Sequence, residues 1–133
     1  MKVVFDTNIL VSALLWRGTP YHCLLAVRAG LAELILSPPI MEEFRSVLCM
    51  KFVMTKEEAE ENIGVIREFS ILIDIPGALR VVTDDPDDDK FVETALVAGA
   101  RWLVSGDKHL LRLGEYRGIK VITARAFVDL LAE

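Results

Sequence analysis

Three aspartates stand where a predicted strand ends or a predicted helix begins. Asp6 follows the apolar run of residues 3–5. Asp107 comes just after the run of residues 102–105, and Asp88 lies in the first turn of a helical pattern. In an open parallel α/β sheet, ligands bind outside the carboxyl ends of the strands, so these acids are candidates for one metal-carboxylate site. The alternative is that each aspartate only caps the helix that follows it, which is common.

Helical spacing separates the neighbouring acids of the stretch 84–89 (DDPDDD). Asp88 stands three, four and seven residues before apolar side chains of the same helix, so it is predicted to share the face that packs on the sheet. Asp89 is expected to point to the flank, aligned with Glu93. A carboxylate on the buried side without a partner is costly, and a bound metal ion removes that cost. A solvated helix start with Asp85 as its N-cap explains the acidic run equally well.

The same construction applies to the predicted helix at residues 39–51. Glu43 falls at the edge of its apolar stripe, where it can reach across the top of the sheet, whereas Glu42 falls opposite that stripe. Taken alone, Glu43 is more typical of a surface ion pair with Arg45 or Arg67. A role of Glu43 in the site is suggested only by its combination with the three aspartates.

Four carboxylates from two strand ends and two helices form the candidate set: Asp6, Glu43, Asp88 and Asp107. Oxygen donors of this kind suit Mg2+ or Mn2+, and Mg2+ typically takes one or two carboxylates directly while it keeps several waters. A metal bound in this way lowers the pKa of a water, orients that water towards a phosphorus atom and stabilises charge on the leaving oxygen. Hydrolysis of a phosphodiester is therefore the expected chemistry.

Small polar residues beside the acids are expected to support them: Thr7, Asn8 and Ser105. They can hydrogen-bond a carboxylate or a metal-bound water and so fix its orientation. Asn8 is equally suited to cap the first helix. Basic residues that follow the acids are candidates for contacts with a phosphate backbone: Lys90, Lys108, His109 and Arg112. Solvated charges at helix starts are the simpler explanation of these four.

Apolar strand patterns alternate with helical patterns along the chain, which predicts βαβ units and a parallel sheet. The strands are expected at residues 2–5, 34–36, 71–75, 102–104 and 120–122. The helices are expected at residues 9–15, 20–29, 39–51, 56–69, 86–98 and 124–131. Thr55 with Glu58 three residues on predicts a capping box at one of these helices.

The length and composition indicate one globular domain over residues 1–133. The chain is 53% hydrophobic with a mean hydropathy of +0.39, yet its apolar runs are too short for a membrane span or for a secretory signal, so a cytoplasmic protein is expected. Cys23 and Cys49 lie in no zinc-binding pattern and are expected to be apolar side chains of the interior. The net charge of -5 disfavours broad attraction to nucleic acid, so a polyanionic substrate needs a local cation.

The chain resembles the PIN-domain nucleases, and most closely their small VapC-like group, the toxin components of toxin–antitoxin systems. The resemblance covers nearly the whole length and depends on four motifs in order. These are Asp6-Thr7-Asn8 after the first strand, the helix segment 37–48 with Glu43, Asp85-Pro86-Asp87-Asp88 followed by Ala95, and Ser105-Gly106-Asp107 followed by Leu110-Leu111. Ser105 stands where threonine is frequent in the family. The spacing to Ala95 selects Asp88 among the contiguous aspartates.

The resemblance implies a three-layer αβα sandwich with a central, mainly parallel twisted sheet and an acidic pocket at its carboxyl edge. It further implies cleavage of single-stranded RNA with Mg2+ or Mn2+ by the pocket of Asp6, Glu43, Asp88 and Asp107, with Asn8 and Ser105 as polar support. A homodimer and a cognate antitoxin protein are implied as partners.

Two other functions remain compatible with the residues alone. Another phosphate-processing α/β enzyme is the first, although a second acid two residues after Asp6, typical of one phosphatase class, is replaced by Asn8. A noncatalytic module that binds RNA or protein and uses its acids only as caps is the second. Four inward carboxylates without a metal would repel one another, which disfavours that module.

Overall fold

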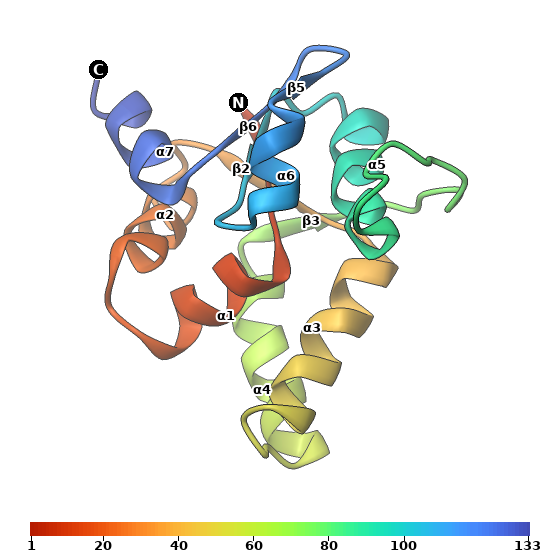
Figure 1. Ribbon diagram of the computed structural model, residues 1–133. Helices are drawn as coiled ribbons and strands as arrows, with labels where there is room; N and C mark the ends of the chain where they lie inside the picture. The colour runs from red at the N-terminus through yellow and green to blue at the C-terminus, as the bar shows by residue number, and fades with distance from the viewer.

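A six-stranded sheet with helices on both faces forms the protein, as the computed structural model of residues 1–133 shows (Figure 1). The strands are β1 (Lys2–Phe5), β2 (Glu33–Leu36), β3 (Ser70–Leu72), β4 (Trp102–Val104), β5 (Glu115–Tyr116) and β6 (Ile119–Ile122). The helices are α1 (Thr7–Leu15), α2 (Thr19–Arg28), α3 (Pro38–Met50), α4 (Lys56–Arg67), α5 (Asp89–Ala98), α6 (Lys108–Leu113) and α7 (Ala124–Leu131), with a 3-10 turn η1 (Pro86–Asp88) before α5. The predicted three-layer α/β sandwich is confirmed.

The strand order is β3-β2-β1-β4-β6-β5, and every pair except β5 with β6 is parallel. The central strands are apolar from Val3 to Phe5 in β1 and throughout β4, as is typical of parallel strands with both faces covered. Their register pairs Phe5 with Val104, and the N–H of Asp6 donates to the carbonyl of Val104 at 3.1 Å. Asp6 and Ser105 therefore leave the sheet side by side at its carboxyl edge.

Two groups of helices cover the sheet. Helices α2 and α7 lie together on one side, while α5 and α3 lie on the other, with α4 packed against α3 (Figure 1). Phe5 of β1 meets Phe127 of α7 edge to face, with ring centroids 6.0 Å apart, and both side chains are fully buried. Such large aromatic contacts hold the layers together and so fix the edge of the sheet from which the acids project.

Most predicted elements are present, with three corrections at the edges of the sheet and around the acidic run. The strand predicted at 71–75 is β3 at Ser70–Leu72, an edge strand that pairs only with β2. Helix α6 and strand β5 were not predicted, because six and two residues are too few to show a period. The helix predicted at 86–98 begins as η1 and becomes α-helical only from residue 89. The capping box of Thr55 and Glu58 is confirmed at α4.

Asp89 and Glu93 lie on the same side of α5, as helical phasing predicted, but that side is covered by the chain. Both residues are buried, at 5% exposure each. The irregular segment 73–85 covers this side of α5 and donates backbone N–H groups to both carboxylates. Asp89 Oδ1 accepts from Val81 at 2.9 Å and from Val82 at 2.8 Å, and Glu93 Oε2 accepts from Ala78 at 3.1 Å. These two acids therefore hold a loop in place.

None of the helices is both long enough and apolar enough to cross a membrane.

Candidate active site

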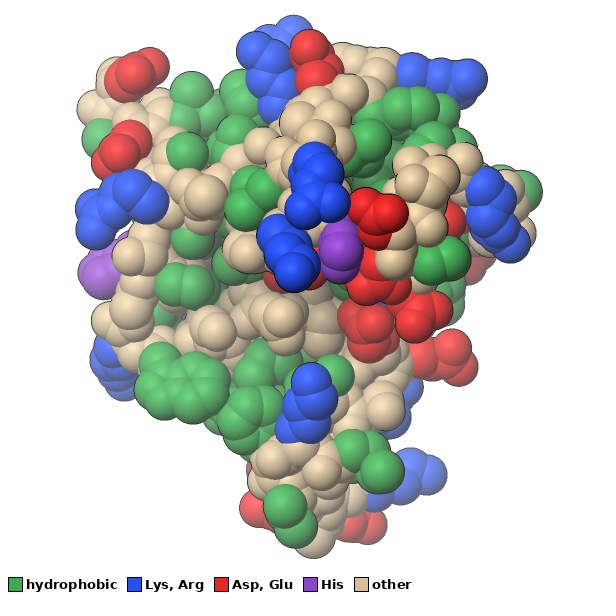
Figure 2. Space-filling view, viewed as in Figure 1, with side chains coloured by type: hydrophobic (Ala, Val, Ile, Leu, Met, Phe, Trp, Pro, Cys, Tyr) green, Lys and Arg blue, Asp and Glu red, His purple; other side chains and the backbone are tan.

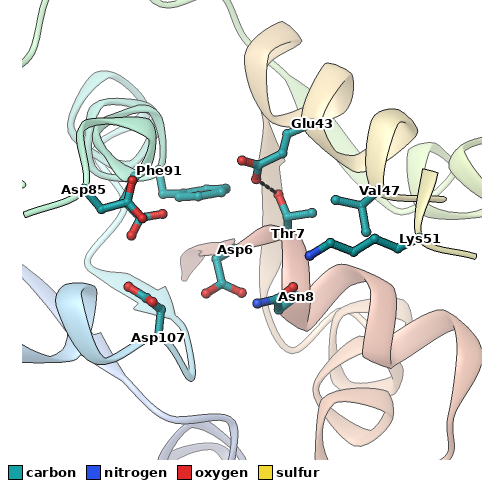
Figure 3. Close-up of a pocket in the computed structure, with 10 residues that line it drawn as sticks. Asp6, Thr7, Asn8, Glu43, Val47, Lys51, Asp85, Phe91 and Asp107 are labelled. Atoms are coloured by element: carbon teal, nitrogen blue, oxygen red, sulfur yellow. Dashed lines mark hydrogen bonds between the residues drawn. The ribbon is translucent and has the colours of Figure 1, made fainter. Parts of the chain in front are cut away.

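A pocket of about 250 Å³ opens at the carboxyl edge of β1 and β4 (Figure 3). Among its lining residues are six of those predicted from the sequence: Asp6, Thr7, Asn8, Glu43, Asp88 and Asp107. Four further residues complete the lining: Val47, Lys51, Asp85 and Phe91. The fold thus brings together all four predicted carboxylates, although they are far apart in the chain. Figure 2 shows Asp and Glu side chains gathered beside a histidine on one face of the molecule.

Asp6 is at once a helix cap and a wall of the pocket. Its Oδ1 accepts from the N–H of Ile9 at 2.9 Å, which caps α1, and its Oδ2 accepts from the Ser105 hydroxyl. Asn8, the other predicted cap of this helix, is exposed and lines the pocket. Burial raises the pKa of Asp6 to about 6, against the lowering effect of the hydrogen bonds from Ser105 and Ile9. The capping and functional interpretations of Asp6 are therefore compatible.

Ser105 links the ends of the two central strands. Its buried hydroxyl donates to Asp6 and accepts from the backbone N–H of Asp107 at 2.9 Å. One side chain therefore orients the carboxylate after β1 and the turn after β4. This is the support role predicted from the sequence, and a hydroxyl is needed for it because both a donor and an acceptor are used.

Asp107 and Asp88 face each other across the pocket. Asp107 Oδ2 accepts from the N–H groups of His109 and Leu110, both at 3.1 Å, and so caps α6. Burial opposes ionisation of Asp107, but the hydrogen bond from Asp88 and those from the backbone of α6 outweigh it and hold the Asp107 pKa below its usual value. Burial, together with the nearby Asp107 carboxyl, raises the pKa of Asp88 to about 8. The two carboxyls therefore titrate as a pair that retains one proton near neutral pH.

Asp88 makes no capping hydrogen bond, and its Oδ2 is a buried oxygen without a partner. Helical phasing placed this side chain on the inner face of the helix, and the structure agrees that it lies inward, in the pocket. A buried acceptor without a donor costs free energy that a bound cation would recover. Among the acids of the run 84–89, Asp88 is the one with a buried side-chain oxygen that has no partner.

Glu43 reaches the pocket from α3 and is held from two sides. Its Oε2 accepts from the Thr7 hydroxyl, and its Oε1 lies 3.0 Å from the Lys90 ammonium. The surface partners considered from the sequence were Arg45 and Arg67, but Arg45 pairs with Glu60 instead. The contact with Thr7 connects α3 to α1 at the rim of the pocket.

A buried hydroxyl pair connects the helices that carry Glu43 and Asp88. The hydroxyls of Ser37, the N-cap of α3, and Thr94 of α5 lie 2.8 Å apart, and both residues are fully buried. This contact fixes the start of α3 against α5. It therefore sets the spacing across the pocket between the two acids carried by helical segments.

The predicted basic residues are placed in three ways. Lys90 is paired with Glu43, so its ammonium belongs to the rim of the pocket. His109 and Arg112 face Asp84, with distances of 3.8 Å from Nδ1 and 3.2 Å from the guanidinium nitrogen to Oδ2. Lys108 is exposed at the start of α6. Contacts of these four residues with a nucleic acid stay predictions.

Sequence analysis missed two charged lining residues, Lys51 and Asp85, as parts of the pocket. Asp85 was expected to be a cap, and it does cap η1, where its side chain accepts from Asp87 N–H at 3.2 Å. Lys51 was expected only as the last residue of the helix predicted at residues 39–51. Its spacing from Glu43, eight residues along one helix face, was the signal that places its ammonium near the acids.

The donor set suits a hard divalent cation. All the candidate ligands are carboxylates, two of them have pKa values raised to about 6 and about 8, and Asp88 offers an unpartnered buried oxygen. A cation favours the ionised forms that burial disfavours. No three His, Cys, Asp or Glu side chains form a complete ligand set by themselves.

A central parallel sheet with a carboxylate pocket outside its strand ends defines an α/β protein with a candidate metal-dependent active site. The chain belongs to the PIN domain family, because the family model described as "PIN domain" matches residues 2–109. The predicted resemblance is thereby confirmed, and membership supports a nuclease as the class of activity. No curated protein matches the sequence.

Solved structures share the fold over almost the whole chain. VapBC2 from Rickettsia felis, bound to a DNA fragment from its promoter, contains a chain that is 16% identical, with a TM-score of 0.66 and coverage of 92% of this chain and 98% of that one. PAE2754 from Pyrobaculum aerophilum is 15% identical, with a TM-score of 0.66 and coverage of 99% and 98%. At such identities the likeness concerns the fold.

Proposed function

We propose that the protein is a metal-dependent endoribonuclease that hydrolyses phosphodiester bonds of single-stranded RNA. The observation that carries this proposal is the pocket in which Asp6, Glu43, Asp88 and Asp107 converge at the carboxyl edge of the sheet. Family membership supports the class of reaction.

The residues of the pocket have distinct roles in this proposal. A bound Mg2+ or Mn2+ ion supplies an activated water and stabilises charge on the leaving oxygen. Asp6 and Asp107 are held by their own helix caps and by Ser105, so their carboxylates are oriented before any ligand arrives. Glu43 is held by Thr7 in the same way. Such prior orientation lowers the reorganisation that a reaction would otherwise need.

We further propose that the protein acts in the cytoplasm as the toxin of a toxin–antitoxin pair, as a homodimer silenced by a cognate antitoxin protein. The structural likeness to a chain of the VapBC2 complex supports this role. An antitoxin with basic side chains would suit the acidic pocket. A test is co-purification of the protein with the product of a neighbouring small reading frame, and recovery of activity when that product is removed.

Cleavage of labelled single-stranded RNA with and without Mn2+, beside duplex DNA, tests the central proposal. RNA should be cut only when the metal is present. Asp88→Asn and Glu43→Gln should each reduce the rate by a large factor, on the order of a hundredfold or more, the loss that removal of one transition-state contact produces.

The chain offers matched controls for both substitutions. Glu42→Gln removes the same charge from an exposed position beside Glu43, and Asp87→Asn does so beside Asp88. Both should cleave like the wild type. If Asp88→Asn and Glu43→Gln also cleave like the wild type, the proposed mechanism is wrong.

A further inference from the structure

Two helices that line the acidic pocket, α1 and α3, run outward from it towards a pair of exposed aromatic side chains. The helices are bridged at the inner end by the contact of Thr7 with Glu43. At the outer end the ring of Trp16 meets the ring of Phe52 edge to face, with centroids 5.8 Å apart. Trp16 is 54% exposed and Phe52 is 37% exposed. Exposed apolar side chains are common when they stand singly, whereas these two rings contact each other on the surface.

Helical spacing places the aromatic pair at the outer ends of the helices that line the pocket. On α3, Glu43, Val47 and Lys51 recur every four residues, and all three line the pocket. On α1, Asn8 lines the pocket and Trp16, the C-cap, lies eight residues further along. Eight residues of α-helix span ~12 Å. A short segment of single-stranded nucleic acid could therefore reach from the four carboxylates to the aromatic pair.

Lys51 supplies the positive charge on this path. It is the only cation among the residues that line the pocket, and Figure 3 shows its ammonium group directed towards Asn8 and Asp6. It belongs to none of the four ion pairs of the protein. In a chain of net charge -5, an unpaired ammonium beside an acidic site is suited to a phosphate group of the substrate.

The segment after Lys51 presents further apolar surface at the tip between α3 and α4. Val53 adopts a left-handed backbone conformation with φ of 53° and is 84% exposed. That conformation is costly for a β-branched residue. It turns the chain directly after Phe52, beside Trp16. Hydrophobic side chains gather on the lower part of the face shown in Figure 2, near the α3–α4 tip of Figure 1.

We propose that Lys51 and the Trp16–Phe52 pair form a substrate-binding path, in which Lys51 contacts a backbone phosphate and the aromatic rings stack on a nucleobase of single-stranded RNA. The inference rests on the proposed ribonuclease function. It assigns to this path the strand that leaves the scissile phosphate. Alternation of a cation with an aromatic platform is the arrangement by which proteins hold single strands without reading sequence. Duplexes are excluded because their bases are already stacked.

Tryptophan fluorescence gives a test that does not depend on cleavage. The chain has two tryptophans, and the second, Trp102, lies in β4. A short oligouridylate added in Ca2+ should quench the wild type and Trp102→Phe, whereas Trp16→Phe should lose most of the quenching. Trp16→Ala should weaken oligouridylate binding, measured by anisotropy of a labelled strand, roughly 5- to 100-fold, as expected for loss of one base stack.

Two further variants separate the parts of the path. Lys51→Ala should lower the slope of log Kd against log salt by about 0.7, as loss of one phosphate contact with a single strand does. Leu31→Ala is the control, because it removes an apolar side chain that is 58% exposed just before β2, at the amino end of the strand. It should change neither the affinity for oligouridylate nor the salt dependence of binding. In cleavage assays with Mn2+, Trp16→Ala should raise KM and leave kcat near the wild-type value.

The outcomes distinguish this inference from the function on which it rests. If the wild type shows no metal-dependent cleavage of RNA, the proposed function fails and the path fails with it. If the wild type cleaves RNA, but Trp16→Ala keeps its KM and RNA does not quench Trp16, only the path is wrong. If Trp16→Ala instead converts a dimer to a monomer in sedimentation experiments, the patch is a contact between two copies, which also overturns the inference.

Discussion

Replacement of Asp88 by asparagine is expected to stabilise the metal-free protein and to remove most of its response to Mg2+ or Mn2+. The Asp88 carboxyl has a buried oxygen without a partner, and burial together with Asp107 raises its pKa to about 8. Ionisation of Asp88 above that pH therefore opposes folding. An asparagine amide has no charge to bury and can donate a hydrogen bond to Asp107.

The size of the effect follows from the pKa of Asp88. The rise from 3.8 to about 8 sets an upper bound of about 6 kcal/mol at high pH, because one pKa unit is worth about 1.4 kcal/mol. Asp88 is only half-buried, so solvent screening reduces this figure to roughly 1–2 kcal/mol. For a chain of this size, that free energy raises Tm by roughly 3–10 °C.

Thermal unfolding followed by circular dichroism, at pH 8 in EDTA and again with millimolar Mn2+, measures both effects. The Tm of the wild type should rise when the metal is added, because the metal binds the folded state preferentially. Asp88→Asn should have a higher Tm than the wild type in EDTA, and its Tm should rise little when the metal is added. Asp87→Asn is the matched control, since it makes the same change at an exposed neighbouring position, and it should behave like the wild type. An Asp88→Asn protein that unfolds earlier in EDTA, or that keeps the full metal-induced rise, would refute the reasoning.

Three further predictions concern stability. In EDTA, the pKa values of Asp6, about 6, and Asp88, about 8, lie above the ordinary 3.8. The folded protein therefore holds these protons more tightly than the unfolded chain, and the stability gained in this way is complete below about pH 4 and is lost as pH rises through both values. Tm in EDTA should fall between pH 5 and 8.5, and a rise would contradict this. Asp89→Ala leaves two backbone N–H groups of the loop unpaired and should lower the free energy of unfolding in urea by roughly 2–4 kcal/mol without loss of the metal response. Thr55→Ala removes the capping box of α4 and should cost about 1 kcal/mol in the same assay.

Hydrophobic periodicity and strand-end chemistry were enough to predict the layers of the fold and the four acids of the pocket. Asp6 and Asp107 follow central parallel strands, whose carboxyl ends must meet at one edge. Helical phasing selected Asp88 and Glu43 correctly as lining residues, because both lie on helical segments that pack against the sheet. These features are local in the sequence or follow from parallel pairing.

Features that depend on tertiary contacts were not predictable in the same way. Asp89 lies on a side of α5 that is polar by pattern, and only the loop 73–85, which has no period of its own, makes that side buried. The pairing of Lys90 with Glu43 joins α5 to α3 across 47 residues of chain, a distance that no local pattern encodes.

The hydroxyl of Ser105, which ties the end of β1 to the turn after β4, has a consequence for the order in which the molecule becomes competent. The central strand comes first in the chain, but its neighbour β4 comes about a hundred residues later. During synthesis, Asp6 therefore reaches its final orientation only after Ser105 and Asp107 have been made. A chain that carries Asp6, Glu43 and Asp88 but has not yet paired β4 lacks both Asp107 and the group that orients Asp6. The pocket is therefore incomplete until β4 and the turn that carries Asp107 have been made and paired with β1.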